Sequence, residues 1–168
     1  MIVSVSKIAK RIIIGIDPGL HNTGWGVISH ESNKSSFIAS GTIVTSPKAE
    51  MPERLKKIAQ EISKVIKTYN PHEVSIEETF VNKNNLSSLK LGHARGAIIV
   101  TIALNDIKIW EYSATNVKKT IVGKGRAEKQ QVEMMVKILL PKATPKTEHE
   151  ADALAIALTH ANSTHNFY

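Results

Sequence analysis

The sequence predicts one α/β domain, built on a single mixed five-stranded sheet that helices flank. Two observations favour this fold class. Short strand-like segments alternate with amphipathic segments along most of the chain, and no repeat or long linker divides its 168 residues. A chain of this length is typical of one domain with a substantial core. We expect the domain over residues 11–162, with tails at 1–10 and 163–168.

The first third of the domain predicts three strands joined by short turns. Residues 11–17 form an almost unbroken β-branched run, which is typical of a strand buried on both faces. Pro18 and Gly19 then supply turn residues that end it. Two further strands are expected at 23–29 and 37–45, with the Ser- and Asn-rich residues 31–36 as their turn. Strands joined by short turns pair antiparallel.

The remaining elements alternate between helix and strand. A helix at 52–69 follows from apolar residues at three- and four-residue spacing, and Asn70-Pro71 ends it. The later elements expected are a strand at 73–76 that runs into Glu77, a helix at 86–104, a strand at 107–112, a helix at 127–140 and a last helix at 147–161. Strands separated by helices need crossovers, so we expect this part of the sheet to be parallel.

The charge balance and composition exclude several function classes. Lys and Arg number 22 against 15 Asp and Glu, and the net charge of +7 favours an anionic partner, nucleic acid before a membrane surface. The absence of cysteine excludes a disulfide framework, a thiol nucleophile and a cysteine zinc site. No apolar run approaches the roughly 18 residues of a membrane helix. We therefore expect a soluble cytoplasmic protein.

Three acidic residues adjoin apolar sequence. Asp17 ends the first strand, Glu77 ends a later one, and Asp152 lies in the Ala- and Leu-rich part of the last helix. Each alone has a simpler explanation: a turn residue, a solvated strand end or an exposed helix residue. Together they would form a cluster that repels itself unless a cation such as Mg²⁺ or Mn²⁺ fills it. A basic protein with such a cluster indicates two-metal phosphodiester chemistry, although spacing alone leaves open whether the three meet.

Five motifs occur in one order along residues 11–162. They are Ile14-Gly-Ile-Asp-Pro-Gly19 with Thr23-Gly-Trp-Gly26, Ser75-Ile-Glu-Glu-Thr-Phe80, Ser88-Leu-Lys-Leu-Gly-His-Ala-Arg-Gly96, Val117-Lys-Lys-Thr-Ile-Val-Gly123 with Ala127-Glu-Lys129, and Glu150-Ala-Asp-Ala-Leu-Ala-Ile-Ala157. In sequence and spacing they resemble the RuvC family of Holliday-junction resolvases. The resemblance covers nearly the whole chain.

The resemblance implies an RNase H-like fold and a bacterial homodimer that resolves four-way DNA junctions in recombination and repair. It implies paired symmetric nicks, 5′-phosphate and 3′-hydroxyl ends, two Mg²⁺ ions per site with Mn²⁺ as a substitute, and a branch-migration helicase partner. Asp17, Glu77 and Asp152 match three metal-binding carboxylates of the family. His149 stands at the fourth position, which is often Asp, three residues before Asp152 and on the same helix face. We expect it to bind or position the second metal or the attacking water.

A basic segment and a polar loop predict the DNA-contacting surface. The basic segment, residues 118–129, is expected to be a pliable loop that contacts DNA phosphates. A solvated loop without a DNA partner would have the same composition. By the resemblance, Lys118 is the cation expected at the cleaved strand. Phe80 lies in an Asn-rich loop, with Lys83 nearby, and would stack on an unpaired base as a wedge, unless it caps the core. The cations of the basic segment are Lys118, Lys119, Lys124, Arg126 and Lys129.

Other interpretations stay open at this point. A junction-binding protein without catalysis is one, because His149 replaces a carboxylate. Another nuclease of the same fold, acting on RNA-containing duplexes, is the second. A two-domain ATPase is excluded by chain length and by the lack of a phosphate-binding loop with Gly-Lys-Ser/Thr. The helix at 86–104 carries Gly92 and Gly96 and is either a core helix or, as the family suggests, a dimer interface; His93 and Arg95 within it receive no role.

Overall fold

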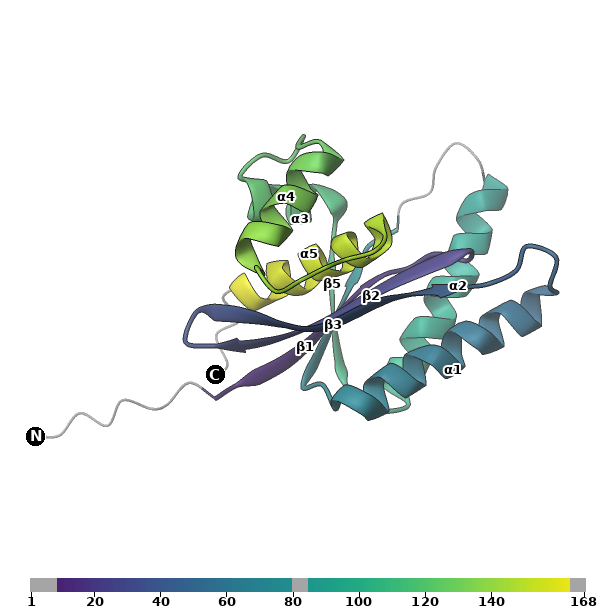
Figure 1. Ribbon diagram of the computed structural model, residues 1–168. Coiled ribbons are helices and arrows are strands. Elements are labelled where there is room, and N and C mark those ends of the chain that lie inside the picture. The colour runs from purple at the N-terminus through teal and green to yellow at the C-terminus, as the bar shows by residue number, and fades with distance from the viewer. Residues whose placement is uncertain (1–8, 80–84, 164–168) are drawn as a thin grey trace, which may run out of the picture.

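The computed structural model describes residues 9–79 and 85–163 of the chain. It contains a five-stranded sheet in the order β3-β2-β1-β4-β5. Helices cover both of its faces (Figure 1). The strands are β1 (Arg11–Asp17), β2 (Asn22–Glu31), β3 (Lys34–Val44), β4 (Glu73–Glu77) and β5 (Lys108–Tyr112). The predicted α/β class and single mixed sheet are confirmed.

Strand pairing brings the ends of β1 and β4 to one edge of the sheet. β1 pairs antiparallel with β2, where Asp17 lies opposite Gly24. β1 pairs parallel with β4, and the last matched pair is Ile16 with Ile76. Asp17 and Glu77 therefore end neighbouring parallel strands, one residue beyond that pair. Open α/β sheets bind ligands at the carboxyl ends of their strands, where these two residues lie.

The turn between β2 and β3 is shorter than predicted. The sequence predicted a turn over 31–36, but only Ser32 and Asn33 separate the strands. Both have positive φ, 48° and 63°, which matches a two-residue hairpin turn of the primed type. Because this turn continues the strand twist, Glu31 pairs directly with Lys34 and both strands lengthen.

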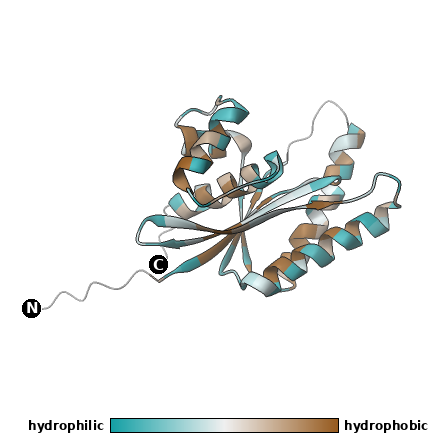
Figure 2. Cartoon of the chain, viewed as in Figure 1, coloured by the Kyte–Doolittle hydropathy of each residue, from teal (hydrophilic) through white to brown (hydrophobic). Residues whose placement is uncertain are grey.

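Two helical layers enclose the sheet. Alternate residues of β1 serve both layers: Ile13 packs in the core with α3 to α5, whereas Ile14 packs in the core with α1 and α2. In Figure 2, α1 alternates between hydrophobic and hydrophilic residues, as a helix covering one face of a sheet should. The helices are α1 (Met51–Tyr69), α2 (Asn85–Ala103), α3 (Ala114–Val122), α4 (Lys129–Leu139) and α5 (Glu148–Asn162).

Helix α3 corrects the expectation of a basic loop. Lys118 and Lys119 lie on this helix, and the loop proper covers only the residues between α3 and α4. The signals are local: the Ser113 side chain caps the first turn by accepting from Asn116 N at 3.2 Å, and Gly123 ends the helix with φ 84°. Sequence reasoning missed it because nine residues with few apolar side chains give a weak periodic pattern.

Glycine lets α5 lie directly against β1 and β2. A Cβ atom at Gly15 would come 2.0 Å from the Ala153 carbonyl oxygen, and one at Gly24 would come 2.0 Å from that of His149. Larger residues at these positions would hold the helix away from the sheet. The close approach sets the N-terminal part of α5 beside the end of β1. No helix in the described part of the chain is long and apolar enough to cross a membrane.

Candidate active site

The structure brings Asp17, Glu77, His149 and Asp152 to one place. Asp17 and Glu77 end the neighbouring parallel strands β1 and β4. His149, in the first turn of α5, has Nδ1 2.8 Å from Asp17 Oδ2. Asp152 follows one turn later. Its negative charge raises the pKa of Glu77, and the charge of Asp17 raises the pKa of Asp152. The four side chains thus come from two strands and one helix.

Helix α5 is held in position by a carboxylate that sequence reasoning overlooked. Glu150 is buried, with 5% exposure, and accepts hydrogen bonds from Ser40 Oγ at 2.8 Å and Lys146 N at 3.2 Å. Thr147 caps the helix by accepting from Glu150 N at 3.2 Å. The signal was present as Thr followed by Glu three residues later, the pattern of a helix start. These contacts tie the first turn of α5 to β3.

Burial and mutual repulsion dominate the electrostatics of the cluster. Burial, then the charges of Asp17 and Asp152, raise the pKa of Glu77 to about 7. Burial, then Asp17, raises the pKa of Asp152 to about 6. The pKa of Asp17 is also raised by burial, which its bond with His149 opposes. The three carboxyl groups therefore resist full ionisation near neutral pH without an added cation.

The donor chemistry of the cluster fits a divalent metal. In the described part of the chain, no three His, Asp or Glu side chains already lie close enough together to hold a metal ion. Carboxylate oxygens suit Mg²⁺ or Mn²⁺, and an imidazole favours Mn²⁺. Asp17, Glu77, Asp152 and His149 are the residues that would hold it.

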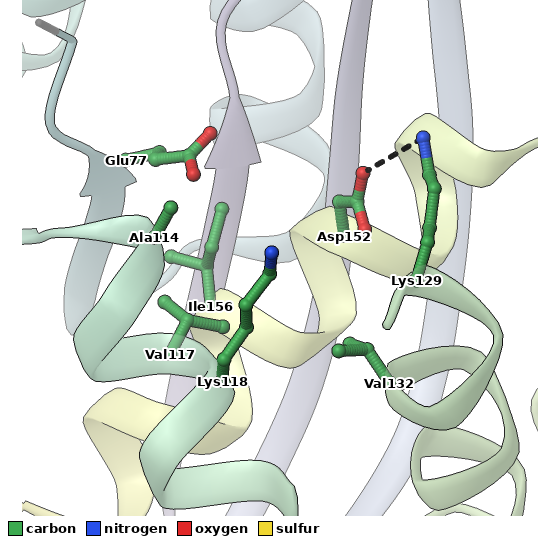
Figure 3. Close-up of a pocket in the computed structure, with 8 residues that line it drawn as sticks. All are labelled: Glu77, Ala114, Val117, Lys118, Lys129, Val132, Asp152 and Ile156. Carbon is green, nitrogen blue, oxygen red and sulfur yellow. Dashed lines mark ion pairs between the residues drawn. The ribbon is translucent and has the colours of Figure 1, made fainter. Parts of the chain in front are cut away.

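A cavity of about 230 Å³ opens beside the cluster. Glu77 and Asp152 lie on two sides of it, and Val117 and Ile156 form part of its apolar wall. Figure 3 shows Lys118 reaching from α3 toward the space between the two carboxylates. Lys118 opposes the rise in the pKa of Glu77 through its charge. A negatively charged group in this cavity would meet the Lys118 cation on its wall.

Lys129 lies at the rim of the same cavity. Its Nζ is 2.7 Å from Glu148 Oε2 and 3.8 Å from Asp152 Oδ2, so the first residues of α4 and α5 are joined. The remaining cations, Lys119, Lys124 and Arg126, are exposed on α3 and the following loop. Phe80 and Lys83, which the sequence placed against DNA, lie outside the described residues.

Comparison with known proteins identifies the family. A sequence profile described as Crossover junction endodeoxyribonuclease RuvC matches residues 13–160. This chain belongs to the RuvC family. The RuvC protein of Xanthobacter autotrophicus is 52% identical over 150 residues, 89% of each chain. That of Azorhizobium caulinodans is 50% identical over 150 residues, again 89% of each chain.

RuvC structures share the fold as well. Thermus thermophilus RuvC is 35% identical, with a TM-score of 0.81 over 89% of this chain and 93% of that one. A second structure of Thermus thermophilus RuvC, in complex with Holliday junction substrate, has a TM-score of 0.84 at 35% identity and covers 90% of this chain and 93% of that one. The predicted RNase H-like fold and the family resemblance are both confirmed.

Proposed function

We propose that the cluster around Asp17 is the active site with which this chain nicks four-way DNA junctions. As a RuvC-family member the chain is a crossover junction endodeoxyribonuclease, a hydrolase of recombination and repair. One observation carries the assignment of the site: three partly buried carboxyl groups and an imidazole lie at the ends of β1 and β4 and the start of α5, beside a cavity that Lys118 lines. The carboxyl groups that could bind a metal ion and the Lys118 cation that could bind a phosphate thus lie beside the same cavity.

RuvC-family nucleases depend on metal, and Asp17, Glu77, Asp152 and His149 are the residues that would hold it here. We propose two Mg²⁺ ions per site, with Mn²⁺ as a substitute. Divalent ions supply activation of water at neutral pH and stabilisation of the leaving 3′ oxygen. The products would then be 5′-phosphate and 3′-hydroxyl ends.

His149 and Lys118 have separate proposed tasks. The 2.8 Å contact between His149 Nδ1 and Asp17 Oδ2 orients the imidazole, and Nε2, on the other side of the ring, lies 3.9 Å from Glu148 Oε1. We assign Nε2 to the second cation or to a proton of the attacking water. Lys118, inside the cavity, is assigned to the scissile phosphate, whose charge increases in the transition state.

The exposed cations are proposed to bind the arms of the junction. Lys119, Lys124 and Arg126 extend from the cavity along α3 and its loop, and Lys129 stands at the rim. Such contacts to phosphate give salt-dependent affinity but do not recognise the DNA base sequence. Phe80, as a wedge between bases, and Lys83 stay predictions from the sequence.

Helix α2 is proposed as the dimer interface. Its outer side exposes Leu89 and Val100, at 59% and 57%, and Cβ atoms at Gly92 and Gly96 would meet nothing within 4 Å. Two copies would deliver the two symmetric nicks that a two-fold junction requires. The RuvC relatives are bacterial. A branch-migration helicase partner and a cytoplasmic location are proposed on the family likeness alone.

Cleavage of a labelled, mobile four-way junction tests the function. Linear duplex and an RNA–DNA hybrid are run beside it, each in Mg²⁺ and in Mn²⁺. We expect paired, ligatable nicks on the junction alone, and their loss in Asp17→Asn with junction binding preserved. Tight binding without cleavage in either metal would instead indicate a junction-binding protein, and cleavage of the hybrid would indicate a different nuclease.

A further inference from the structure

Arg95, on α2, contacts the ends of two neighbouring strands. Its Nε donates to the main-chain oxygen of Glu77, at the end of β4, over 3.4 Å. Its Nη2 forms an ion pair with the carboxylate of Glu111 on β5. The Arg95 side chain is 19% exposed, whereas that of Glu111 is 48% exposed. Because a guanidinium presents its donors in a fixed fork, this one side chain joins α2, β4 and β5.

The contact acts where pairing of β4 with β1 has ended. β4 pairs with β1 only as far as Ile76, one residue before Glu77. On the other side, Glu77 lies opposite Tyr112 of β5, and Glu78 N donates to the Tyr112 carbonyl over 2.9 Å. The Glu77 backbone is thus paired with a neighbouring strand on the β5 side only. The hydrogen bond from Arg95 adds a contact from helix α2.

The Glu77 carboxylate lies among like charges. Asp17 and Asp152 both raise the energy of its ionised form. A strand end that is free to move would relieve this repulsion by carrying the carboxylate outward. A donor bonded to the main-chain oxygen opposes that movement and leaves the side chain available as a ligand.

We propose that Arg95 is a positioning residue that fixes the end of β4, so that the Glu77 carboxylate is presented to a divalent cation. The inference rests on the proposed metal-binding role of Glu77. Arg95 lies on the same helix as the exposed Leu89 and Val100, so the contact also joins the proposed dimer face to the proposed active site. Groups that orient metal ligands in this way commonly change metal affinity or activity by about 10–100-fold.

Calorimetric titration of the full chain with Mn²⁺, without DNA, tests this role. We expect Arg95→Ala to weaken Mn²⁺ binding by roughly tenfold or more. The direction is decisive, because removing a positive charge near an acidic cluster would by electrostatics alone strengthen cation binding. Arg95→Lys should also be weakened, since an ammonium cannot replace the planar fork that reaches both partners. Raising the Mn²⁺ concentration should restore much of the junction cleavage.

Three further measurements distinguish failure of the Arg95 positioning role from failure of the proposed metal site. Lys56→Ala removes an exposed cation on α1 and should leave Mn²⁺ affinity unchanged. Junction binding in Ca²⁺ should be unchanged in both Arg95 variants. If Glu77→Gln abolishes Mn²⁺ binding while Arg95→Ala or Arg95→Lys binds as the wild type does, the positioning role is wrong. If Glu77→Gln itself binds Mn²⁺ normally, the proposed metal site fails instead. Arg95→Lys keeps the test valid if Arg95→Ala does not fold.

Discussion

The imidazole Nδ1 of His149 and the carboxylate Oδ2 of Asp17 lie 2.8 Å apart, although 132 positions separate the two residues in the chain. One residue ends the first strand and the other begins the last helix. The contact depends on the close approach of α5 to the sheet. It joins the one imidazole of the cluster to its most buried carboxylate and gives His149 a fixed orientation.

Replacement of His149 tests whether this orientation serves catalysis. We expect His149→Ala to lower the cleavage rate by about 10–1000-fold in Mg²⁺, because a general acid–base group or a metal ligand is lost. His149→Asp should retain cleavage, with a relative shift from Mn²⁺ toward Mg²⁺, since an oxygen ligand replaces a nitrogen. Rates are measured from pH 5.5 to 8.5. A wild-type rate for His149→Ala across this range would contradict the role.

The raised pKa of Glu77 predicts how pH affects stability without metal. The carboxyl group binds its proton more tightly in the folded chain, with a pKa of about 7 against an ordinary value of 4.5. The folded state therefore loses stability as pH rises from about 4.5 through 7, and the protonated form is the stable one. We expect a loss on the order of 1 kcal/mol, reduced by solvent screening.

Denaturant unfolding in EDTA at pH 5 and pH 8 measures this change. Glu77→Gln should show a smaller difference between the two pH values, because its amide does not ionise. Added Mn²⁺ should raise stability most at pH 8, where the carboxylates are ionised and free to bind it. Equal pH dependence in the wild type and in Glu77→Gln would show that other groups cause it.

Much of the fold, and the residues that the structure brings together at the candidate site, could be predicted from the sequence, because strong local patterns encode them. The β-branched run of β1 and the apolar spacing of α1 gave elements whose bounds differ little from those observed. The acidic residues were found because each interrupts apolar sequence at a strand end or on a helix. Their proximity could not be derived from spacing, since it depends on sheet order and on the packing of α5.

Elements with weak local patterns were missed or misplaced. The nine residues of α3 appeared as a loop, because the helix is set by a Ser113 cap and by packing of Val117 and Ile121 against α5. The role of Arg95 was also hidden. Its partners are a main-chain oxygen and a carboxylate on another strand, and no local spacing records such a contact.

The lysines of α3 predict separable effects on catalysis and on binding. Lys118→Ala should slow cleavage by about 100-fold or more with little loss of junction affinity, because Lys118 lies in the cavity. Lys119→Ala should leave the single-turnover rate near that of the wild type and reduce the slope of log affinity against log salt by about one. Fluorescence anisotropy at several salt concentrations and single-turnover cleavage measure the two effects. A cleavage defect in Lys119→Ala together with a purely binding defect in Lys118→Ala would contradict these two assignments.

The glycine at position 24 gives the sharpest test of how the fold places the site. A Cβ atom there would come 2.0 Å from the His149 carbonyl oxygen, so Gly24→Ala must displace the first turn of α5 from β2. We expect a loss of about 1–3 kcal/mol in the free energy of unfolding, as for other overpacked sites.

The activity of Gly24→Ala separates displacement from simple instability. Ile58→Ala, on α1 at the opposite face of the sheet, removes a fully buried side chain and should lose about 2–5 kcal/mol without touching α5. Both variants are assayed well below their melting temperatures. We expect Gly24→Ala to cleave junctions at least tenfold more slowly than Ile58→Ala, although the range expected for its loss of stability is the lower of the two. His149 and Asp152 move with the displaced turn, and α1 carries neither. Equal rates for the two variants would mean that the contact between β2 and α5 serves stability alone.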